Sequence, residues 1–180
     1  MLNEKQLLRR AKQGCRDSVR QIYELYSDQM LTLANALLND IAASEDVVHD
    51  VFVNFAQSLD KFKLKKNLRA YFATCTRNLA RDRLRARKRH AEKLPRLARK
   101  NIDHTTPDTQ AQQKESADLL RDALQHLPIE QRETVVLRIR TGLSFKQIAD
   151  VQDVSTNTAQ GRYRYGLDKL RSLLNDEIQL

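Results

Sequence analysis

Residues 141–174 read TGLSFKQIADVQDVSTNTAQGRYRYGLDKLRSLL and have the layout of a helix-turn-helix. Gly142 is placed to end one helix with a left-handed residue. Ser144 and Gln147 have the spacing of a capping box, which starts a short second helix. A turn then leads to a further start signal at Ser155. The stretch therefore predicts the end of one helix at Gly142, then a short helix, a turn and a longer helix.

The longer helix has one apolar face, which leaves polar side chains free over its first half. Asn, Gln and Arg can make bidentate contacts with bases in the major groove. The candidate base-contacting residues are Ser155, Thr156, Asn157, Thr158, Gln160, Arg162 and Arg164. An ordinary amphipathic hairpin is the alternative. Gly161 and Gly166 favour an interface, since each costs about 1 kcal/mol inside a helix and close approach of a phosphate or another helix would offset that cost.

The rest of the chain is also predicted to be helical. Four Gly and three Pro in 180 residues are too few for a β-sandwich or barrel. Apolar periodicity predicts helices over residues 3–12, from Asp17 to about Asn39, from an N-cap at Ser44, and from an N-cap at Asn67. No run reaches the ~18 apolar residues of a membrane span, and the N-terminus lacks the apolar core of a signal peptide. We expect no membrane insertion and a cytoplasmic location.

The positive charge is concentrated near the middle of the chain. Residues 81–100 hold 10 Lys and Arg against 2 acidic residues, whereas the whole chain has a net charge of +9. Such a block indicates a polyanionic partner, either nucleic acid or an acidic membrane surface, and a solvated charged face is the alternative. The helical periodicity then decays into polar sequence with two prolines. We predict an all-α fold in which two small helical domains, 1–90 and 116–180, are joined by a basic flexible linker at 91–115.

A stripe of basic residues lies on the helix that follows Asn67. Arg77, Arg81, Arg85 and Lys88 are spaced by four, four and three, which places them on one helical face that can follow a DNA backbone. Upstream, aromatic and basic residues alternate, as on surfaces where single-stranded bases stack. Core packing is the alternative for these aromatic rings and is favoured for Tyr71 and Phe72. The residues concerned are Lys61, Phe62, Lys63, Lys65, Lys66, Arg69, Tyr71 and Phe72.

The segment SEDVVHDVFVNFAQSL, residues 44–59, is acidic on one face at Asp46 and Asp50 and apolar on the other. Because a DNA-binding surface should not present acid, a docking site for another protein is the favoured interpretation, with a solvated face as the alternative. The sequence contains no nucleotide-binding loop, catalytic carboxylate pair or metal-ligand spacing, so we expect no enzymatic activity, cofactor or metal. Cys15 and Cys75 are interpreted as small core residues in a reducing compartment.

Together these motifs resemble the bacterial RNA polymerase sigma factors of the small extracytoplasmic-function (ECF) type. The resemblance covers about residues 17–90 and 116–175. Its second conserved region corresponds to Ser44-Glu45-Asp46, residues 47–52, and Arg77-Asn78 with Asp82 and Arg85. Its fourth region corresponds to Leu127-Pro128, the QRETVVLR run and the helix-turn-helix. The resemblance implies a promoter-specificity subunit that binds core RNA polymerase through the clamp of its largest subunit and through its flap.

The resemblance also implies roles for individual residues. Asp46, His49, Asp50 and Phe52 would contact the clamp coiled coil. Loop 61–67 and helix 68–85 would open and read the minus-ten element, which adds Asn67 and Asn78 to the candidate residues. The C-terminal helix would read the minus-thirty-five element as duplex DNA, the linker would thread toward the active-site and RNA-exit channels, and any anti-sigma regulator would be a separate chain. A free-standing dimeric helix-turn-helix regulator is the alternative.

Overall fold

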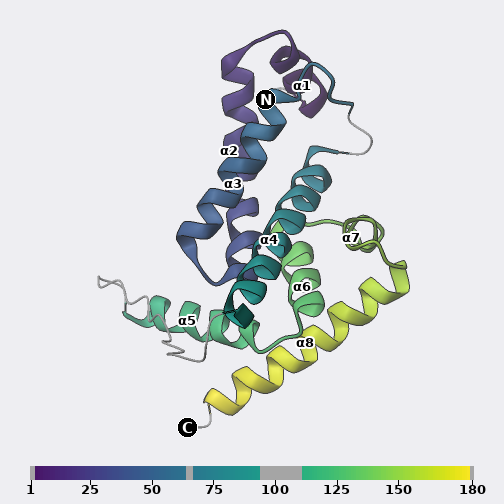
Figure 1. Cartoon of the computed structure of the whole chain (residues 1–180). Coiled ribbons are helices and arrows are strands. Elements are labelled where there is room, and N and C mark those ends of the chain that lie inside the picture. The colour runs from purple at the N-terminus through teal and green to yellow at the C-terminus, as the bar shows by residue number, and fades with distance from the viewer. Residues whose placement is uncertain (1–2, 64–66, 94–110, 179–180) are drawn as a thin grey trace.

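The computed structural model describes residues 3–63, 67–93 and 111–178, and every regular element within these ranges is an α-helix (Figure 1). This confirms the all-α prediction. The helices are α1 (Glu4–Lys12), α2 (Arg16–Leu38), α3 (Ile41–Gln57), α4 (Leu68–Lys93), α5 (Ala111–Gln125), α6 (Ile129–Thr141), α7 (Phe145–Gln152) and α8 (Thr156–Ile178).

Local capping signals set most helix ends. The Asn67 side chain accepts a hydrogen bond from the Ala70 N–H at 2.7 Å, as the sequence predicts. The start of α3 differs, because Asp40 and not Ser44 is its N-cap. The chain is extended at Asp40, whose carboxylate accepts from the Ala43 N–H at 3.0 Å. Ser44 lies one turn inside the helix, where its hydroxyl donates to the Asp40 carbonyl at 2.6 Å.

Helices α1 to α4 pack around a cluster of aromatic rings. Phe52 and Phe72 stack with ring centroids 5.2 Å apart, and Phe55 meets Phe72 edge-on at 5.0 Å. All three rings are buried, and Phe55 has no exposed surface. This cluster fixes α3 against α4, the two helices that carry the predicted docking and minus-ten residues.

Helices α5, α6 and α8 enclose a second and smaller cluster, which includes Leu127, Val135 and Leu170. Gly166 allows α8 to approach α6, because a Cβ added at this glycine would lie 2.9 Å from a methyl group of Val135. Gly161 has no such neighbour, since its Cβ would meet only a ring atom of Tyr165 at 3.9 Å. Close helix approach therefore explains the glycine at 166 and not the one at 161.

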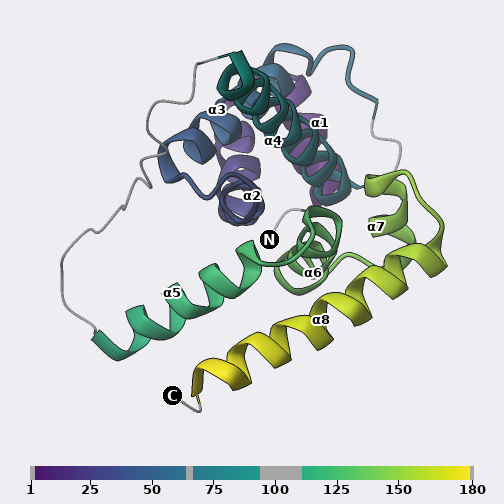
Figure 2. The ribbon, with the colours of Figure 1, turned by 60° about the horizontal axis from the view of Figure 1, so that its bottom comes forward.

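The two helical groups also pack against each other, as Figure 2 shows for α6 beneath α2 and α4. Val136, Leu137 and Ile148 belong to the same continuous apolar core as the aromatic cluster. Arg132, which is 8% exposed, donates from α6 to the Ala36 carbonyl of α2 at 3.1 Å. The sequence predicts two domains but does not predict this contact between them.

The structure describes only the two ends of the predicted linker. Helix α4 continues to Lys93 and α5 begins at Ala111, so helix occupies both ends of the 91–115 segment. Residues 94–110, which form most of the predicted linker, lie outside the described residues.

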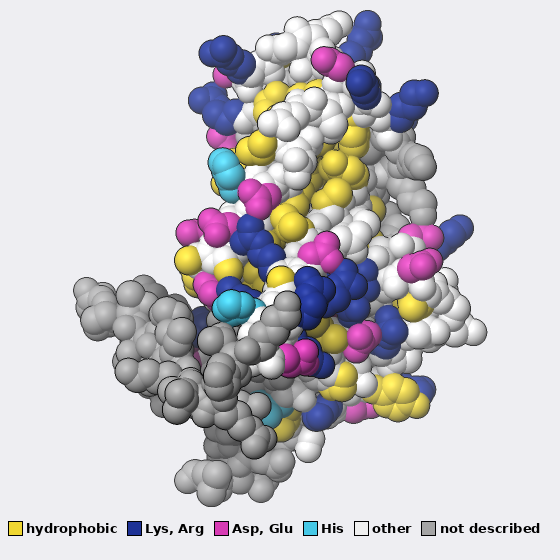
Figure 3. Space-filling model, in the orientation of Figure 1, with side chains coloured by type: hydrophobic (Ala, Val, Ile, Leu, Met, Phe, Trp, Pro, Cys, Tyr) yellow, Lys and Arg dark blue, Asp and Glu magenta, His cyan; other side chains and the backbone are white. Residues whose placement is uncertain are grey.

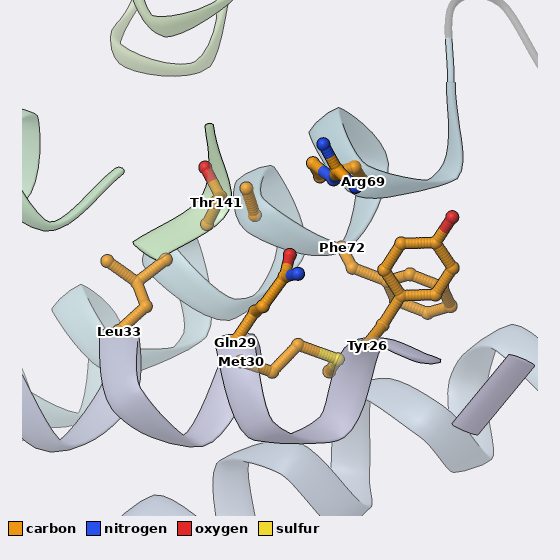
Figure 4. A pocket seen from close by; sticks show the side chains of 8 residues that line it. Tyr26, Gln29, Met30, Leu33, Arg69, Phe72 and Thr141 are labelled. Carbon is orange, nitrogen blue, oxygen red and sulfur yellow. The ribbon is translucent and has the colours of Figure 1, made fainter. Parts of the chain in front are cut away.

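Close to the aromatic cluster, α2, α4 and α6 enclose a small pocket (Figure 4). Gln29 of α2 and Thr141 of α6 point into it, and Met30 and Leu33 line its floor. Side chains from both helical groups line this pocket, which therefore lies on the interface between them.

Candidate functional site

The C-terminal helices form the predicted helix-turn-helix. The Ser144 hydroxyl accepts from the Gln147 N–H at 3.3 Å, and the Gln147 side chain accepts from the Ser144 N–H at 2.8 Å, which confirms the capping box. Asp153 ends α7 in the left-handed region, with φ 55°. Ser155 begins the next helix by accepting from the Thr158 N–H at 3.1 Å. The second helix of the motif, α8, is thus held at its N-terminus by local hydrogen bonds.

Most of the predicted base-contacting side chains on α8 are exposed. The exposed residues are Ser155, Thr156, Asn157, Thr158, Gln160 and Arg164. Arg162 is half-buried instead, and its Nη1 donates to the Gln152 side-chain oxygen at 2.9 Å. The Arg164 guanidinium lies over the Tyr165 ring, 4.9 Å from its centroid. The sequence did not single out Gln152, because its role depends on contacts among three helices.

Helix α6 covers the first two residues of the basic stripe on α4, Arg77 and Arg81. The Nε atom of Arg77 lies 2.9 Å from a carboxylate oxygen of Glu133, and Arg81 contacts the other oxygen. Arg81 also contacts Glu130, with 3.1 Å between Nη2 and Oε1. The Glu133 side chain has no exposed surface, and that of Arg77 is 12% exposed. The stripe predicted to follow a DNA backbone is therefore not available to DNA at Arg77 and Arg81 in this arrangement, because carboxylates of α6 cover them.

The charges in this contact stabilise one another. Burial alone would raise the pKa of Glu130, but hydrogen bonds from its own backbone and from Arg81 outweigh burial, and its pKa lies below the ordinary value. Burial alone would lower the pKa of Arg81, yet hydrogen bonds to Glu133 and Glu130 raise it. Both groups are therefore ionised at neutral pH, and the contact is a charged one.

The remaining minus-ten candidates divide into exposed and buried residues. Lys61, Lys63, Asn78 and Arg85 are exposed, and Asn67 is half-buried as the cap of α4. Arg85 pairs with Asp82, which lies three residues before it on the same helix. Lys65 and Lys66 lie outside the described residues.

The aromatic residues of this region pack into the core. Phe62 is 9% exposed and meets Phe55 and Tyr71 edge-on, with centroid distances of 5.2 and 4.8 Å. Tyr71 is half-buried, and burial raises its pKa to about 12. Phe72 is 1% exposed. Core packing therefore accounts for Phe62 and Phe72, and in this arrangement Phe62 has no open face on which a base could stack.

The acidic face of α3 is exposed but internally paired. Arg83 of α4 contacts Asp50 at 2.7 Å and Asp46 at 3.5 Å, and it donates to the Ala43 carbonyl at 2.9 Å. The Asp46 side chain remains 73% exposed and that of Asp50 48% exposed. Figure 3 shows charged side chains of both signs gathered below a strip of apolar ones.

Phe52, predicted to contact the clamp, lies on the other side of α3. It is 8% exposed and packs against Tyr23 and Phe72. An exposed apolar residue of this helix is Val53, which is 37% exposed and shares a helical face with His49 and Asp50. Val53 follows Asp50 by three residues and Asp46 by seven. This spacing places it on the same helical face as the two acids and could have predicted its position from the sequence.

Of the two cysteines predicted to be core residues, Cys75 packs against the core and Cys15 does not belong to it. Cys15 is the N-cap of α2, and hydrogen bonds from Ser18 lower its pKa. Cys75 is half-buried against the core, and burial raises its pKa. Among the described residues, no group of three or more His, Cys, Asp or Glu is arranged to hold a metal ion. Within the same residues, no helix is long and apolar enough to cross a membrane.

Comparisons with known proteins identify both helical groups. Residues 22–90 match the family Sigma-70 region 2, and residues 117–170 match Sigma-70, region 4. The chain is 22% identical over 181 residues to the ECF RNA polymerase sigma factor SigW of Bacillus subtilis, covering 96% of this chain and 97% of that protein. It is 27% identical over 172 residues to the sigma factor CarQ of Myxococcus xanthus, covering 94% and 96%. The chain belongs to the ECF sigma factors.

Solved structures share the fold of this sigma factor. One is CnrH, solved in complex with the cytosolic domain of CnrY, with a TM-score of 0.72, 24% identity, and coverage of 96% of this chain and 97% of that chain. Another is the sigma factor RpoE of Bartonella quintana, solved with the anti-sigma factor NepR, with a TM-score of 0.68, 23% identity, and coverage of 87% and 96%. Both support the all-helical architecture.

As an ECF sigma factor, the protein directs promoter-specific transcription initiation, and its regions 2 and 4 imply binding to core RNA polymerase and to DNA. Sigma factors are generally not enzymes. The alternative of a free-standing dimeric regulator is not favoured, because that class would not account for the match to region 2 ahead of region 4.

Proposed function

We propose that the sigma factor divides promoter recognition and polymerase binding among α3, α4 and α8. The observation that carries this proposal is the different character of the helix faces: α3 carries exposed acidic residues and no Lys or Arg, whereas exposed basic and polar side chains lie on α4 and on the first half of α8. We assign residues 1–90 to region 2, 91–115 to the linker and 116–180 to region 4. We also infer that the chain acts without catalysis of its own and works in the cytoplasm, where the polymerase is.

The exposed face of α3 is proposed to dock on the clamp of the largest polymerase subunit. Its members are Asp46, His49, Asp50 and Val53. A mixed acidic and apolar face suits a basic protein partner, because opposite charge steers the encounter and apolar burial adds affinity. Arg83 already neutralises part of Asp50, so a partner would have to compete with Arg83 or add to its contacts.

Helix α4 and the loop before it are proposed to bind the opened minus-ten strand. Lys61, Lys63, Asn78 and Arg85 can reach DNA in the arrangement described, since each is exposed. Arg77 and Arg81 can join them only after leaving Glu133. Region 4 must therefore move away from region 2 before the whole basic stripe can meet DNA.

The first half of α8 is proposed to read the minus-thirty-five element in a major groove. The exposed residues at 155–158, with Gln160, Arg164 and the half-buried Arg162, suit direct readout of base edges. The linker is proposed to run toward the active-site and RNA-exit channels, and region 4 is proposed to contact the polymerase flap. An anti-sigma protein is proposed as a separate partner, supported by the solved relatives CnrH and RpoE, which were solved in complex with the cytosolic domain of CnrY and with the anti-sigma factor NepR.

The docking assignment is tested by co-purification with core polymerase. Changing Asp46 and Asp50 to Lys should abolish the association, because two new positive charges would then face, and repel, a basic partner. Glu24→Lys is the matched control, since Glu24 is an exposed, ion-paired acid on the neighbouring α2. The uncharged pair Asp46→Asn and Asp50→Asn should weaken association without placing new cations beside Arg83. Full co-purification of both double variants would contradict the docking assignment.

A further inference from the structure

Gln152 is a buried amide at the point where α6, α7 and α8 meet. It is the last residue of α7 and is 4% exposed. Its Nε2 donates to the Glu130 carbonyl and to a Glu133 carboxylate oxygen, each at 3.1 Å. Its Oε1 accepts from Nη1 of Arg162 at 2.9 Å. The Gln152 side chain thus connects α8 to α6, the helix that precedes the helix-turn-helix.

The chemistry of its partners fixes the orientation of this amide. A guanidinium can only donate, whereas a carboxylate and a carbonyl can only accept. An inverted amide would place its NH2 group against Arg162 and its oxygen against two acceptors. The Thr134 hydroxyl lies 3.1 Å from Oε1, but it has one proton and also lies 2.7 Å from the Glu130 carbonyl. Arg162 is therefore the main donor to Oε1.

This contact sets Arg162 apart from its neighbours on α8. Gln160 and Arg164 are exposed, whereas Arg162 is half-buried and turned back toward α7. A buried polar side chain whose partners are all supplied favours one arrangement over its alternatives. The direction of the Arg162 guanidinium thus depends on residue 152, which α7 and not α8 contributes.

We propose that Gln152 is a positioning residue for minus-thirty-five recognition, which acts through Arg162 without touching DNA itself. The inference rests on the proposed role of α8 as the reader of duplex DNA. A group that contacts a base or phosphate must be held close to its productive geometry, and supporting hydrogen bonds are what hold it. Gln152 supplies that support at the one α8 candidate that is not fully exposed.

The test uses reconstituted holoenzyme on promoters changed one base pair at a time in the minus-thirty-five element. Gln152→Leu should reduce discrimination at the base pair reached through Arg162 by roughly tenfold, with minus-ten preference unchanged. Gln147→Leu is the matched control, since it removes an amide of the same helix that only caps α7. It should lower transcription from all promoters alike. The same uniform loss with Gln152→Leu would overturn the inference.

A double variant separates positioning from a general structural effect. In an Arg162→Ala background, Gln152→Leu should cause no further loss of discrimination, because the residue through which it acts is gone. Gln152→Glu keeps an oxygen that accepts from Arg162 and should retain most of the discrimination, even though it faces Glu133. Additive losses, or a Glu variant as indiscriminate as Arg162→Ala, would overturn the inference, and the Glu variant decides if the Leu variant does not fold.

A second readout requires no polymerase. The side-chain Nε–H signal of Arg162 in the free, ¹⁵N-labelled protein can be assigned by its loss in Arg162→Lys. It should shift in Gln152→Leu and stay in place in Gln147→Leu. An unmoved signal would overturn the positioning role alone, whereas a wild-type holoenzyme insensitive to the minus-thirty-five sequence would contradict the proposed function of α8.

Discussion

Helices α4 and α8 both carry residues assigned to DNA, but the fold leaves them in opposite states. On α4, Arg77 and Arg81 are covered by α6 and paired with Glu133. On α8, Gln160 and Arg164 face solvent. A basic stripe in a sequence therefore identifies residues able to bind a polyanion, but the packing of another helix decides whether they are available.

The two helices also differ in what DNA must displace before it can bind them. A buried carboxylate keeps its charge only if partners replace the water it has lost, and Glu133, which has no exposed surface, obtains two arginines from another helical group. DNA phosphates would have to displace that carboxylate from Arg77 and Arg81. On α8, phosphates and bases would displace only water from most of the candidate side chains.

The largest expected effect comes from removing the carboxylate that covers α4. Glu133→Ala should destabilise the packing of α6 against α4 by about 3–5 kcal/mol, because it leaves Arg77, which is 12% exposed, without a carboxylate and Arg81 with Glu130 alone. Glu130→Ala should cost about 1 kcal/mol at most, since the Glu130 side chain is 39% exposed. Denaturant unfolding and the radius of gyration from small-angle scattering provide the measurements. Equal effects of the two variants would show that Glu133 does not hold the regions together.

A smaller effect should distinguish the two helices by the promoter element they read. Gln160→Ala should relax preference at one base pair of the minus-thirty-five element by about 1–3 kcal/mol and leave minus-ten preference intact. Asn78→Ala should do the converse, because Asn78 is exposed on α4. Transcription from promoters mutated singly in each element measures both. If the α8 variant changed only minus-ten preference, the two assignments would be reversed.

The smallest effect concerns how binding of single-stranded minus-ten DNA to the free protein depends on salt. Arg85→Ala should lower the slope of log affinity against log salt by about 1 if Arg85 contacts a phosphate. Arg81→Ala should leave the slope of the free protein unchanged, because Arg81 is held by Glu133. In a Glu133→Gln background, Arg81→Ala should lower the slope as well. A wild-type slope that falls with Arg81→Ala would mean that Arg81 is already available to DNA.

Much of the fold could be predicted from local signals. The Gly142 stop, the capping box at Ser144 and the cap at Asn67 all depend on residues within one turn of each other, and the structure confirms all three. The sequence predicts the N-cap of α3 at Ser44, whereas it lies at Asp40. Both residue types cap helices, and the backbone conformation at position 40 decides between them.

The site could be predicted less well, since exposure depends on distant contacts. Arg77 and Glu133 are 56 residues apart in the chain, and no local pattern links them. Phe52 and Val53 are adjacent, yet one is buried and the other exposed, because the orientation of α3 against Phe72 selects the buried face. In the sequence, Gln152 is an ordinary polar residue at a helix end. Its role follows only from its contacts with α6 and α8.

The apolar core that runs from the aromatic cluster of region 2 into α6 and α7 also affects how the protein responds to temperature. Parting the regions would expose side chains such as Val136 and Leu137, which are now 5% and 0% exposed. Exposure of apolar surface raises the heat capacity, and hydrophobic stabilisation weakens on cooling. The apolar contribution that holds the regions together is therefore smaller in the cold than at moderate temperature, whereas the charged contact at Glu133 does not depend on that term.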